Sequence, residues 1–145
     1  MYEVNLDALR WVERIARSLE SGYVLTIDYG YIQSESVRFP QGTLMSYHRH
    51  IALEDVLARP GERDITAHVN FTALEKQGSQ CGLERVRFET LAQTLLAAGE
   101  ADAFAEVLRT SSPVEEVRHR LQLKTLLFGL GETFRTLLQK KESTK

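Results

Sequence analysis

A short apolar segment that ends in an acidic residue and a glycine most constrains how this chain can fold. Residues 25–30 read Leu-Thr-Ile-Asp-Tyr-Gly, and their apolar, mostly β-branched character predicts a buried strand over residues 23–29. Residues 6–20 place apolar side chains at three- and four-residue spacing, which predicts an amphipathic helix. A helix that leads directly into a buried strand is typical of an α/β protein with a parallel sheet.

A helix, a strand and a long helical segment are predicted downstream. Residues 71–81 follow a capping Asn and predict a helix, and residues 83–88 alternate apolar and charged side chains as a strand does. Helix signals then occupy residues 90–128, among them a capping box and a Ser-Pro helix start. This segment is therefore expected to be a mostly helical insertion before the end of the sheet.

The remaining segments are marked by glycine or by a lack of periodicity. Gly129 and Gly131 are expected to end the helical segment, and residues 133–139 predict the last strand. Residues 31–64 have no strong period, and residues 51–57 within them could form a short helix. About three strands do not make a complete doubly wound sheet, so the pattern indicates the second half of a larger one.

Composition excludes several classes of protein. The 145 residues carry 18 Lys and Arg against 20 Asp and Glu, so the net charge of -2 gives no basic excess for nucleic acid. No apolar run reaches the roughly 18 residues that cross a bilayer, and the first residues lack a signal-peptide pattern. We therefore expect neither a nucleic acid nor a membrane partner. The single cysteine, Cys81, fits a reducing compartment, and we expect a cytoplasmic protein.

The end of the first strand is a candidate binding site. Asp28, Tyr29 and Gly30 follow apolar residues, and ligands of open α/β sheets bind just outside the carboxyl ends of strands. The carboxylate would lie at the mouth of the site, and the glycine would let a ligand approach the backbone. The alternative is a strand end at which the aspartate only caps the following loop.

A second candidate is a row of alternating polar residues. Asp64, Thr66, His68 and Asn70 are separated by apolar residues, so in an extended segment all four side chains point to one side. Such a row could line a cleft, and a histidine near a carboxylate could act as an acid or base. The alternative is an edge segment that leads into the cap of the next helix.

His48 and His50 form a third candidate. In an extended segment they share a face, and His68 could supply a third metal ligand. No cysteine or carboxylate cluster accompanies them, so we expect no metal and treat them as substrate contacts or surface residues. The chain also lacks the nucleophile-elbow, phosphate-loop and dinucleotide glycine motifs, and no catalytic residue is assigned.

In order and spacing, several motifs resemble the MidA-type family of S-adenosylmethionine-dependent methyltransferases. This family includes the mitochondrial complex I assembly-factor arginine methyltransferase and many bacterial relatives. The most diagnostic motif is Asp-Ile-Thr-Ala-His-Val-Asn-Phe, in which the family usually has Asp at the position of Asn70. The matching segments are residues 25–30, 42–44, 47–50, 60–61, 64–71 and 131–135.

The resemblance implies a Rossmann-like class I methyltransferase fold whose last strand runs antiparallel. The three predicted strands would be the fifth, sixth and seventh of the sheet, so residues 1–145 would be a C-terminal portion of the domain. The family's cofactor motifs lie upstream of this portion, so we expect S-adenosylmethionine as cofactor but no cofactor-binding residue in this chain. We expect this chain alone to be inactive.

The resemblance also implies a protein substrate. Methylation of arginine would make Asp28 and Asp64 sensible partners for the cationic guanidinium. A strand without its neighbour would expose a sheet edge, so we expect association with the missing N-terminal half or self-association. The main alternative is a non-catalytic protein-binding or assembly module, and a weaker one is a small hydrolase using His68 and Asp64.

Overall fold

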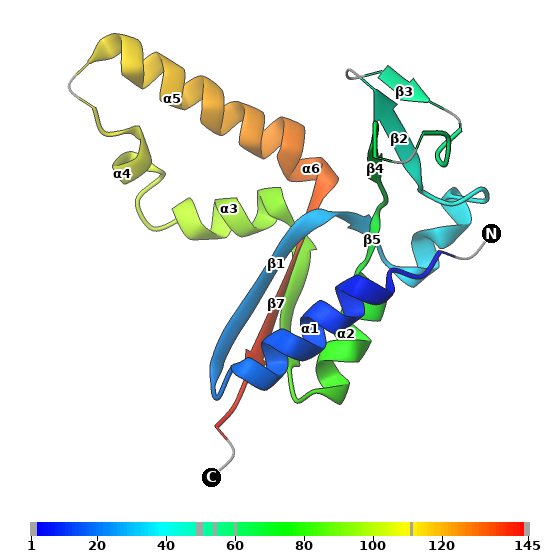
Figure 1. The fold of residues 1–145 in the computed structure, drawn as a ribbon. Coiled ribbons are helices and arrows are strands. Elements are labelled where there is room, and N and C mark those ends of the chain that lie inside the picture. Colours follow the sequence, from blue (N-terminus) through cyan, green and yellow to red (C-terminus); the bar gives the residue numbers. More distant parts are fainter. Residues whose placement is uncertain (1–2, 49–50, 54, 60, 111, 144–145) are drawn as a thin grey trace.

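A four-stranded sheet with two helices on one face forms the body of the protein. The computed structural model describes residues 3–48, 51–53, 55–59, 61–110 and 112–143 (Figure 1). The sheet has the order β5-β1-β7-β6. Its strands are β1 (Gly22–Tyr31), β5 (Val69–Asn70), β6 (Glu84–Thr90) and β7 (Phe134–Lys141). The helices on its face are α1 (Leu6–Ser18) and α2 (Phe71–Gln80). These elements confirm the α/β prediction.

The last strand lies between β1 and β6 and runs antiparallel to both. Its pairing with β1 extends from Gly22 opposite Lys141 to Tyr29 opposite Phe134. The pairing of β6 with β7 is interrupted by a bulge between Arg85 and Arg87. The predicted antiparallel last strand is therefore confirmed, and so are the three long strands.

One face of the sheet carries the core. Phe71 and Leu74 of α2 pack on Leu137 of β7, and Leu9 and Val12 of α1 close the same cluster. Side chains alternate between the two faces along a strand, so every second residue of β1, beginning with Tyr23, points away from this core. There Tyr23, Leu25 and Ile27 are each at least 47% exposed.

β1 also has a largely free edge. Within the described residues its second neighbour is β5, which pairs in parallel with Gly30 and Tyr31. The segment from Gly22 to Tyr29 is paired on one side, with β7. The bare face and the free edge of β1 thus adjoin one another.

Residues 31–66 form structure that the sequence pattern did not indicate. A short 3-10 helix, η1 (Gln33–Arg38), follows β1. A separate sheet of order β3-β2-β4 contains β2 (Met45–His48), β3 (Ile51–Leu53) and β4 (Asp64–Thr66). The predicted helix over residues 51–57 is wrong, because β3 pairs antiparallel with β2 and this pairing overrides a weak local preference.

A helical arm projects from the sheet between β6 and β7 (Figure 1). It consists of α3 (Leu91–Gly99), α4 (Ala105–Leu108), α5 (Pro113–Thr125), η2 (Leu126–Leu130) and α6 (Gly131–Thr133). The predicted stop at the two glycines is wrong, because the helix continues through Gly129 as a π-helical turn and through Gly131 into α6. A side chain at Gly131 would lie 2.6 Å from the Leu126 carbonyl oxygen and 2.9 Å from the Ala92 Cβ. Close packing at the base of the arm therefore explains that glycine.

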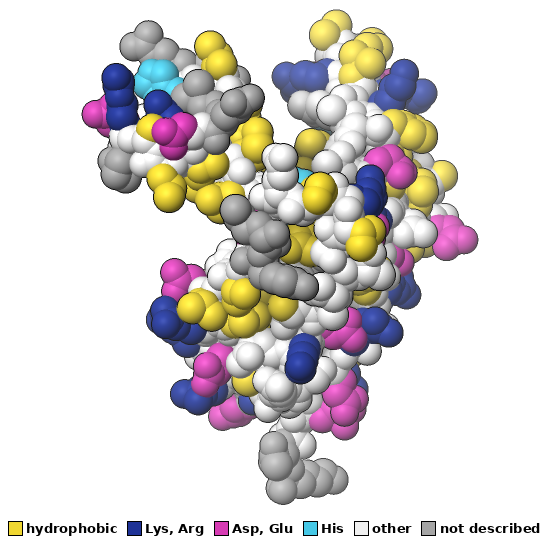
Figure 2. Space-filling view, turned by 90° about the vertical axis from the view of Figure 1, so that its right-hand side faces the viewer, with side chains coloured by type: hydrophobic (Ala, Val, Ile, Leu, Met, Phe, Trp, Pro, Cys, Tyr) yellow, Lys and Arg dark blue, Asp and Glu magenta, His cyan; other side chains and the backbone are white. Residues whose placement is uncertain are grey.

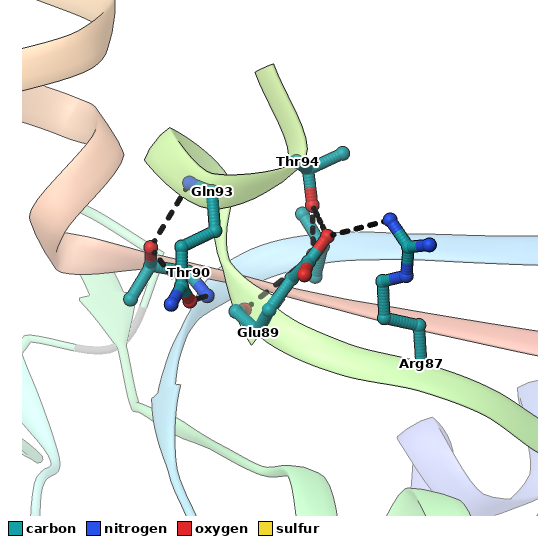
Figure 3. Close-up of polar contacts among 6 residues, drawn as sticks. Arg87, Glu89, Thr90, Gln93 and Thr94 are labelled. Carbon is teal, nitrogen blue, oxygen red and sulfur yellow. Dashed lines mark hydrogen bonds and ion pairs between the residues drawn. The ribbon is translucent and has the colours of Figure 1, made fainter. Parts of the chain in front are cut away.

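Polar contacts fix the base of the arm to the sheet. The Thr94 hydroxyl of α3 donates to Glu89 of β6 at 2.8 Å and lies 2.6 Å from the Thr136 hydroxyl of β7. Arg87 lies 3.6 Å from the same Glu89 carboxylate (Figure 3). Thr90 caps α3 and forms the predicted capping box with Gln93. The base of the arm is thus held to both β6 and β7.

We predict that Gly30→Ala destabilises the protein by about 1–3 kcal/mol, the usual cost of overpacking. A Cβ at Gly30 would lie 2.1 Å from the Val69 carbonyl oxygen, which is backbone and belongs to the strand paired with it. The substitution would therefore push β5 away from β1. Urea unfolding followed by circular dichroism measures the difference.

Gly129→Ala is the matched control for this substitution. Its added Cβ would make an ordinary contact, 3.8 Å from the Thr125 methyl group. Alanine is favoured over glycine in a helix by up to about 1 kcal/mol, so this variant should be as stable as the parent or more stable. Equal unfolding midpoints for both variants would contradict the close approach of β5 to β1.

Candidate functional site

An aromatic cluster lies at the carboxyl end of β1. The Tyr29 ring makes edge-to-face contacts with His68, at 5.3 Å between centroids, and with Phe134, at 5.6 Å. The Phe39 ring contacts the other side of the cluster, 5.2 Å from His68 and 5.4 Å from Tyr31. His68 is therefore held between rings from β1 and from the end of η1.

A chain of hydrogen bonds fixes the backbone next to His68. The Glu3 carboxylate accepts bonds from the Thr43 backbone N–H at 2.8 Å, the Thr43 hydroxyl at 2.7 Å and the Leu44 N–H at 2.9 Å. The same Thr43 hydroxyl accepts a bond from the His68 backbone N–H at 3.0 Å. One buried hydroxyl thus connects the N-terminal segment to the loop that carries the histidine.

These contacts change the acidity of Glu3. Partial burial opposes ionisation, but the hydrogen bonds from Thr43 and Leu44 and the nearby His68 outweigh it, so the pKa of Glu3 lies below its ordinary value. The carboxylate is therefore ionised, and its oxygens are engaged by backbone and hydroxyl donors. Glu3 is a structural anion at the wall of the site.

A second set of bonds joins η1 to the start of α2. Asn70 caps α2 by accepting a bond from the Ala73 N–H at 3.2 Å, and its amide donates to the Gln33 side chain at 3.1 Å. The Gln33 backbone N–H donates to the Thr72 hydroxyl at 3.0 Å. The loop after β1 is thereby attached to the helix that follows β5.

A cavity of about 430 Å³ opens beside these anchors. Its walls include Glu3, Tyr31, Leu44, His68 and Asn70. An adjoining cavity of about 260 Å³ shares Glu3, Tyr31 and Asn70 with it and extends toward Phe39. The carboxyl end of β1 is thus hollowed and lined by polar and aromatic side chains, as ligand sites in open α/β sheets are.

The structure brings some of the candidate residues together and separates others. Tyr29, Gly30, His68 and Asn70 lie together at the carboxyl end of β1. Of the other described candidates, His48, Asp64 and Thr66 belong to the small sheet of β2 and β4, and Asp28 lies in β1. His50 lies outside the described residues.

The segment of the predicted polar row is divided between two sheets. Residues 64–66 pair with β2, residues 69–70 pair with β1, and Ala67 and His68 between them belong to neither strand. The chain therefore passes from one sheet to another within the motif. Local alternation could not reveal this change of partner.

Asp28 and Asp64 occupy different environments. Asp28 lies directly opposite Arg135 of β7, and one of its oxygens accepts a bond from the Tyr29 N–H at 2.8 Å. Arg135 in turn lies 3.6 Å from Glu35 of η1. Asp64 is exposed in β4 and lies opposite Tyr47. Asp28 therefore lies near the carboxyl end of β1 but lines neither cavity, whereas Asp64 belongs to the small sheet.

Sequence reasoning missed Glu3, Thr43 and Gln33, which help to hold the site together. Glu3 and Thr43 are 40 positions apart, and Gln33 and Asn70 are 37 apart. Each is an ordinary polar residue in its own neighbourhood, and no local spacing links the members of a pair. Within the described residues no group of three or more His, Cys, Asp or Glu side chains could hold a metal ion.

Within the described residues, no glycine-rich turn typical of nucleotide-cofactor sites connects a strand to a helix. Such sites use a glycine-rich turn that connects a strand directly to a helix N-terminus. β1 is followed instead by η1 and the small sheet, and the N-termini of α1 and α2 are capped by Asn5 and Asn70. The Glu3 carboxylate is already engaged by backbone donors.

Comparison with protein families identifies the chain. Residues 1–89 match the model of the family Methyltransf_28, described as "Putative S-adenosyl-L-methionine-dependent methyltransferase". The chain belongs to this family. The matched region contains β1, the Glu3 anchor and the whole carboxyl-end cluster except Phe134. No curated protein matches the chain.

Two solved structures from Burkholderia thailandensis are similar to this chain over most of this chain's length. One is "a COG1565 superfamily member and likely methyl transferase" bound to S-adenosyl-homocysteine, with a TM-score of 0.81, 29% identity and 98% of this chain covered. The other is a native crystal structure of "an uncharacterized ACR, COG1565 superfamily protein", with a TM-score of 0.80, 30% identity and 94% covered. This chain spans only 38% and 37% of those two chains. No described helix is long and apolar enough to cross a membrane.

We predict that Glu3→Gln lowers the free energy of unfolding at neutral pH by about 1–2 kcal/mol, because neutral amides accept hydrogen bonds less strongly than carboxylates. The folded-state pKa of Glu3 lies below its unfolded value, so its stabilisation is present above that unfolded value, about 4.5. The stabilisation is lost as the pH falls through the folded-state pKa. The difference between the two proteins should therefore shrink in acid.

Urea unfolding at pH 7 and at several values below 4.5 tests this pH dependence. Glu20→Gln, at an exposed position before β1, is the control and should match the parent throughout. A difference between Glu3→Gln and the parent that stays constant down to the lowest pH would show that the charge of Glu3 is not what stabilises the site.

Proposed function

We propose that this chain is the substrate-side portion of an S-adenosylmethionine-dependent methyltransferase that acts on arginine side chains of proteins. The observation that carries the proposal is the cavity at the carboxyl end of β1, together with the largely unpaired outer edge of that strand. Family membership supports the reaction class, and the S-adenosyl-homocysteine in the Burkholderia thailandensis structure supports the cofactor. The single free cysteine supports a cytoplasmic location.

The cofactor's main site is proposed to come from residues other than those described here. Support comes from the absence of a glycine-rich strand-to-helix turn in the described residues and from the 38% coverage of the structural relative. The chain alone is therefore proposed to be inactive. Its own residues would orient the substrate and exclude water from the carboxyl end of β1.

The free edge of β1 is proposed to receive the neighbouring strand of the cofactor-binding half. Tyr23, Leu25 and Ile27 are exposed on the bare face beside this edge, and a helix of that half would cover them. Exposed apolar edges otherwise invite pairing between copies, so self-association of the chain alone is the expected substitute.

The aspartate at the carboxyl end is proposed to bind the substrate guanidinium. One Asp28 oxygen accepts the Tyr29 N–H, and the other has no hydrogen-bond partner among the described residues. Arg135, the cross-strand neighbour, lies beside Glu35, which offsets part of its positive charge. Asp64 is the second candidate from the resemblance, but its place in the small sheet gives it less support.

We predict that the 145-residue chain does not bind S-adenosyl-homocysteine in a calorimetric titration. A fusion that places the unmatched upstream part of the Burkholderia thailandensis relative before this chain should bind it one-to-one. One-to-one binding by the chain alone would contradict the proposed division of the site. A well-folded fusion that binds no cofactor would favour a non-catalytic binding module.

We predict that Asp28→Asn in this longer fusion lowers methyl transfer to arginine by about 10–100-fold, the usual cost of losing a charge-assisted hydrogen bond in the transition state. Cofactor affinity should be unchanged. The assay is transfer of labelled methyl groups from S-adenosylmethionine to protein, followed by amino-acid analysis. Glu20→Gln removes an exposed charge before β1 and should retain full activity. Label on a residue other than arginine, or full activity of Asp28→Asn, would refute the assignment.

A further inference from the structure

An exposed apolar stripe runs along α5 of the helical arm. Val114, Val117 and Leu121 recur at helical spacing, and each of these side chains is at least 58% exposed. Figure 2 shows hydrophobic side chains exposed in the upper part of the molecule, the level at which the arm lies in Figure 1. Single exposed apolar residues are ordinary, but a periodic set on one helix face indicates a surface that packs against something.

The stripe lines a shallow, open groove whose lining residues all belong to α5 and to Leu126 after it. The space of about 640 Å³ there is lined by Val114, Val117 and Leu121 together with Gln122 and Thr125. From Val114 to Leu126 this surface extends about 18 Å at 1.5 Å per helical residue. This length suits three to four turns of a second helix laid along the groove.

Positive charges border the stripe. Arg118 lies four residues after Val114 and three before Leu121, and Lys124 lies three after Leu121. Positions three and four apart are neighbours on a helix surface, so both cations adjoin the apolar side chains. Arg118 has only an exposed ion pair with Glu115, at 3.8 Å, which is weak enough to be exchanged for another partner.

This charge pattern excludes a second copy of α5 as the best occupant. Antiparallel pairing centred on Leu121 would place Arg118 beside Lys124 of the other copy, and parallel pairing would place like residues together. Like charges beside a helix interface are destabilising, whereas opposite charges stabilise it and set the choice of partner. An anionic membrane is also a poorer match, because Glu115 and Glu116 begin the same helix.

We propose that α5 is a docking site for an amphipathic helix of another protein, with acidic residues beside its apolar stripe. The arm begins at Leu91, after the end of the family-matched region at residue 89, so the groove is not part of the segment that defines the family. Contacts of Thr94 with Glu89 and Thr136 hold the base of the arm against the sheet and so position the groove. The inference does not depend on the methyl-transfer reaction.

Two synthetic peptides test the proposal by fluorescence anisotropy with the 145-residue chain. Each has about 18 residues, enough to span the stripe, with leucine at the helical spacing of the stripe; one has glutamate at the flanking positions and the other lysine. The glutamate peptide should bind at least about tenfold more tightly than the lysine peptide. Arg118→Glu combined with Lys124→Glu should reverse this preference, and Leu121→Ser should weaken binding of the glutamate peptide.

The matched control reverses two exposed charges on α1 instead. Arg10→Glu combined with Arg17→Glu changes the net charge equally and should leave peptide binding unchanged. Circular dichroism and urea unfolding confirm that each variant is folded. Equal binding of both peptides, or no binding of either, would overturn the proposal.

Three further outcomes would name a different occupant and so overturn the proposal. Self-association of the chain that Leu121→Ser abolishes would indicate a second copy. Binding to phosphatidylglycerol vesicles without binding to the glutamate peptide would indicate a membrane. Peptide binding by the chain but not by the longer fusion would indicate that the upstream half covers the groove. None of these measurements involves S-adenosyl-homocysteine, so their failure is distinct from failure of the proposed function.

Discussion

The antiparallel pairing of β1 with β7 is the constraint on which the other features depend. It joins residues 22–29 to residues 134–141, across nearly the whole chain, and places Leu137 against the helices that cover one face. It places Tyr29 directly opposite Phe134 and Asp28 directly opposite Arg135. A shift of one residue would move Leu137 to the bare face and turn the aromatic cluster away from His68. The register of this strand pair therefore determines both the packing of the core and the positions of the site residues.

Local sequence signals predicted the elements whose stability is largely their own. The helix over residues 6–18 carries apolar periodicity and a cap, the helix after Asn70 carries a cap, and the strand at residues 22–31 carries an apolar run. The short strands were not predictable in this way, because two to four residues acquire strand geometry only from a partner. The family resemblance, rather than periodicity, provided the expectation of an antiparallel last strand.

The site was predicted in part for the same reason. Tyr29, Gly30, His68 and Asn70 were selected because polar residues next to a buried strand or at a helix cap are visible in sequence. Glu3 was not visible, because its importance comes from three donors supplied by residues 43 and 44. The carboxylate satisfies backbone N–H groups that would otherwise face a cavity unpaired, which is costly for a buried donor. A polar residue with no local role can thus decide the shape of the site.

The two exposed apolar surfaces of the molecule differ in a physically informative way. The surface of β1 combines a bare face with unpaired backbone at the strand edge, so its natural partner is another strand, which satisfies hydrogen bonds while it buries side chains. The stripe of α5 has no unpaired backbone, since the helix satisfies its own, and its cationic borders select the charge of whatever packs there. The β1 surface therefore selects its partner through backbone geometry, whereas the α5 stripe selects its partner through side-chain charge. This difference is why completion of the sheet and docking of a partner can be separated experimentally in one chain.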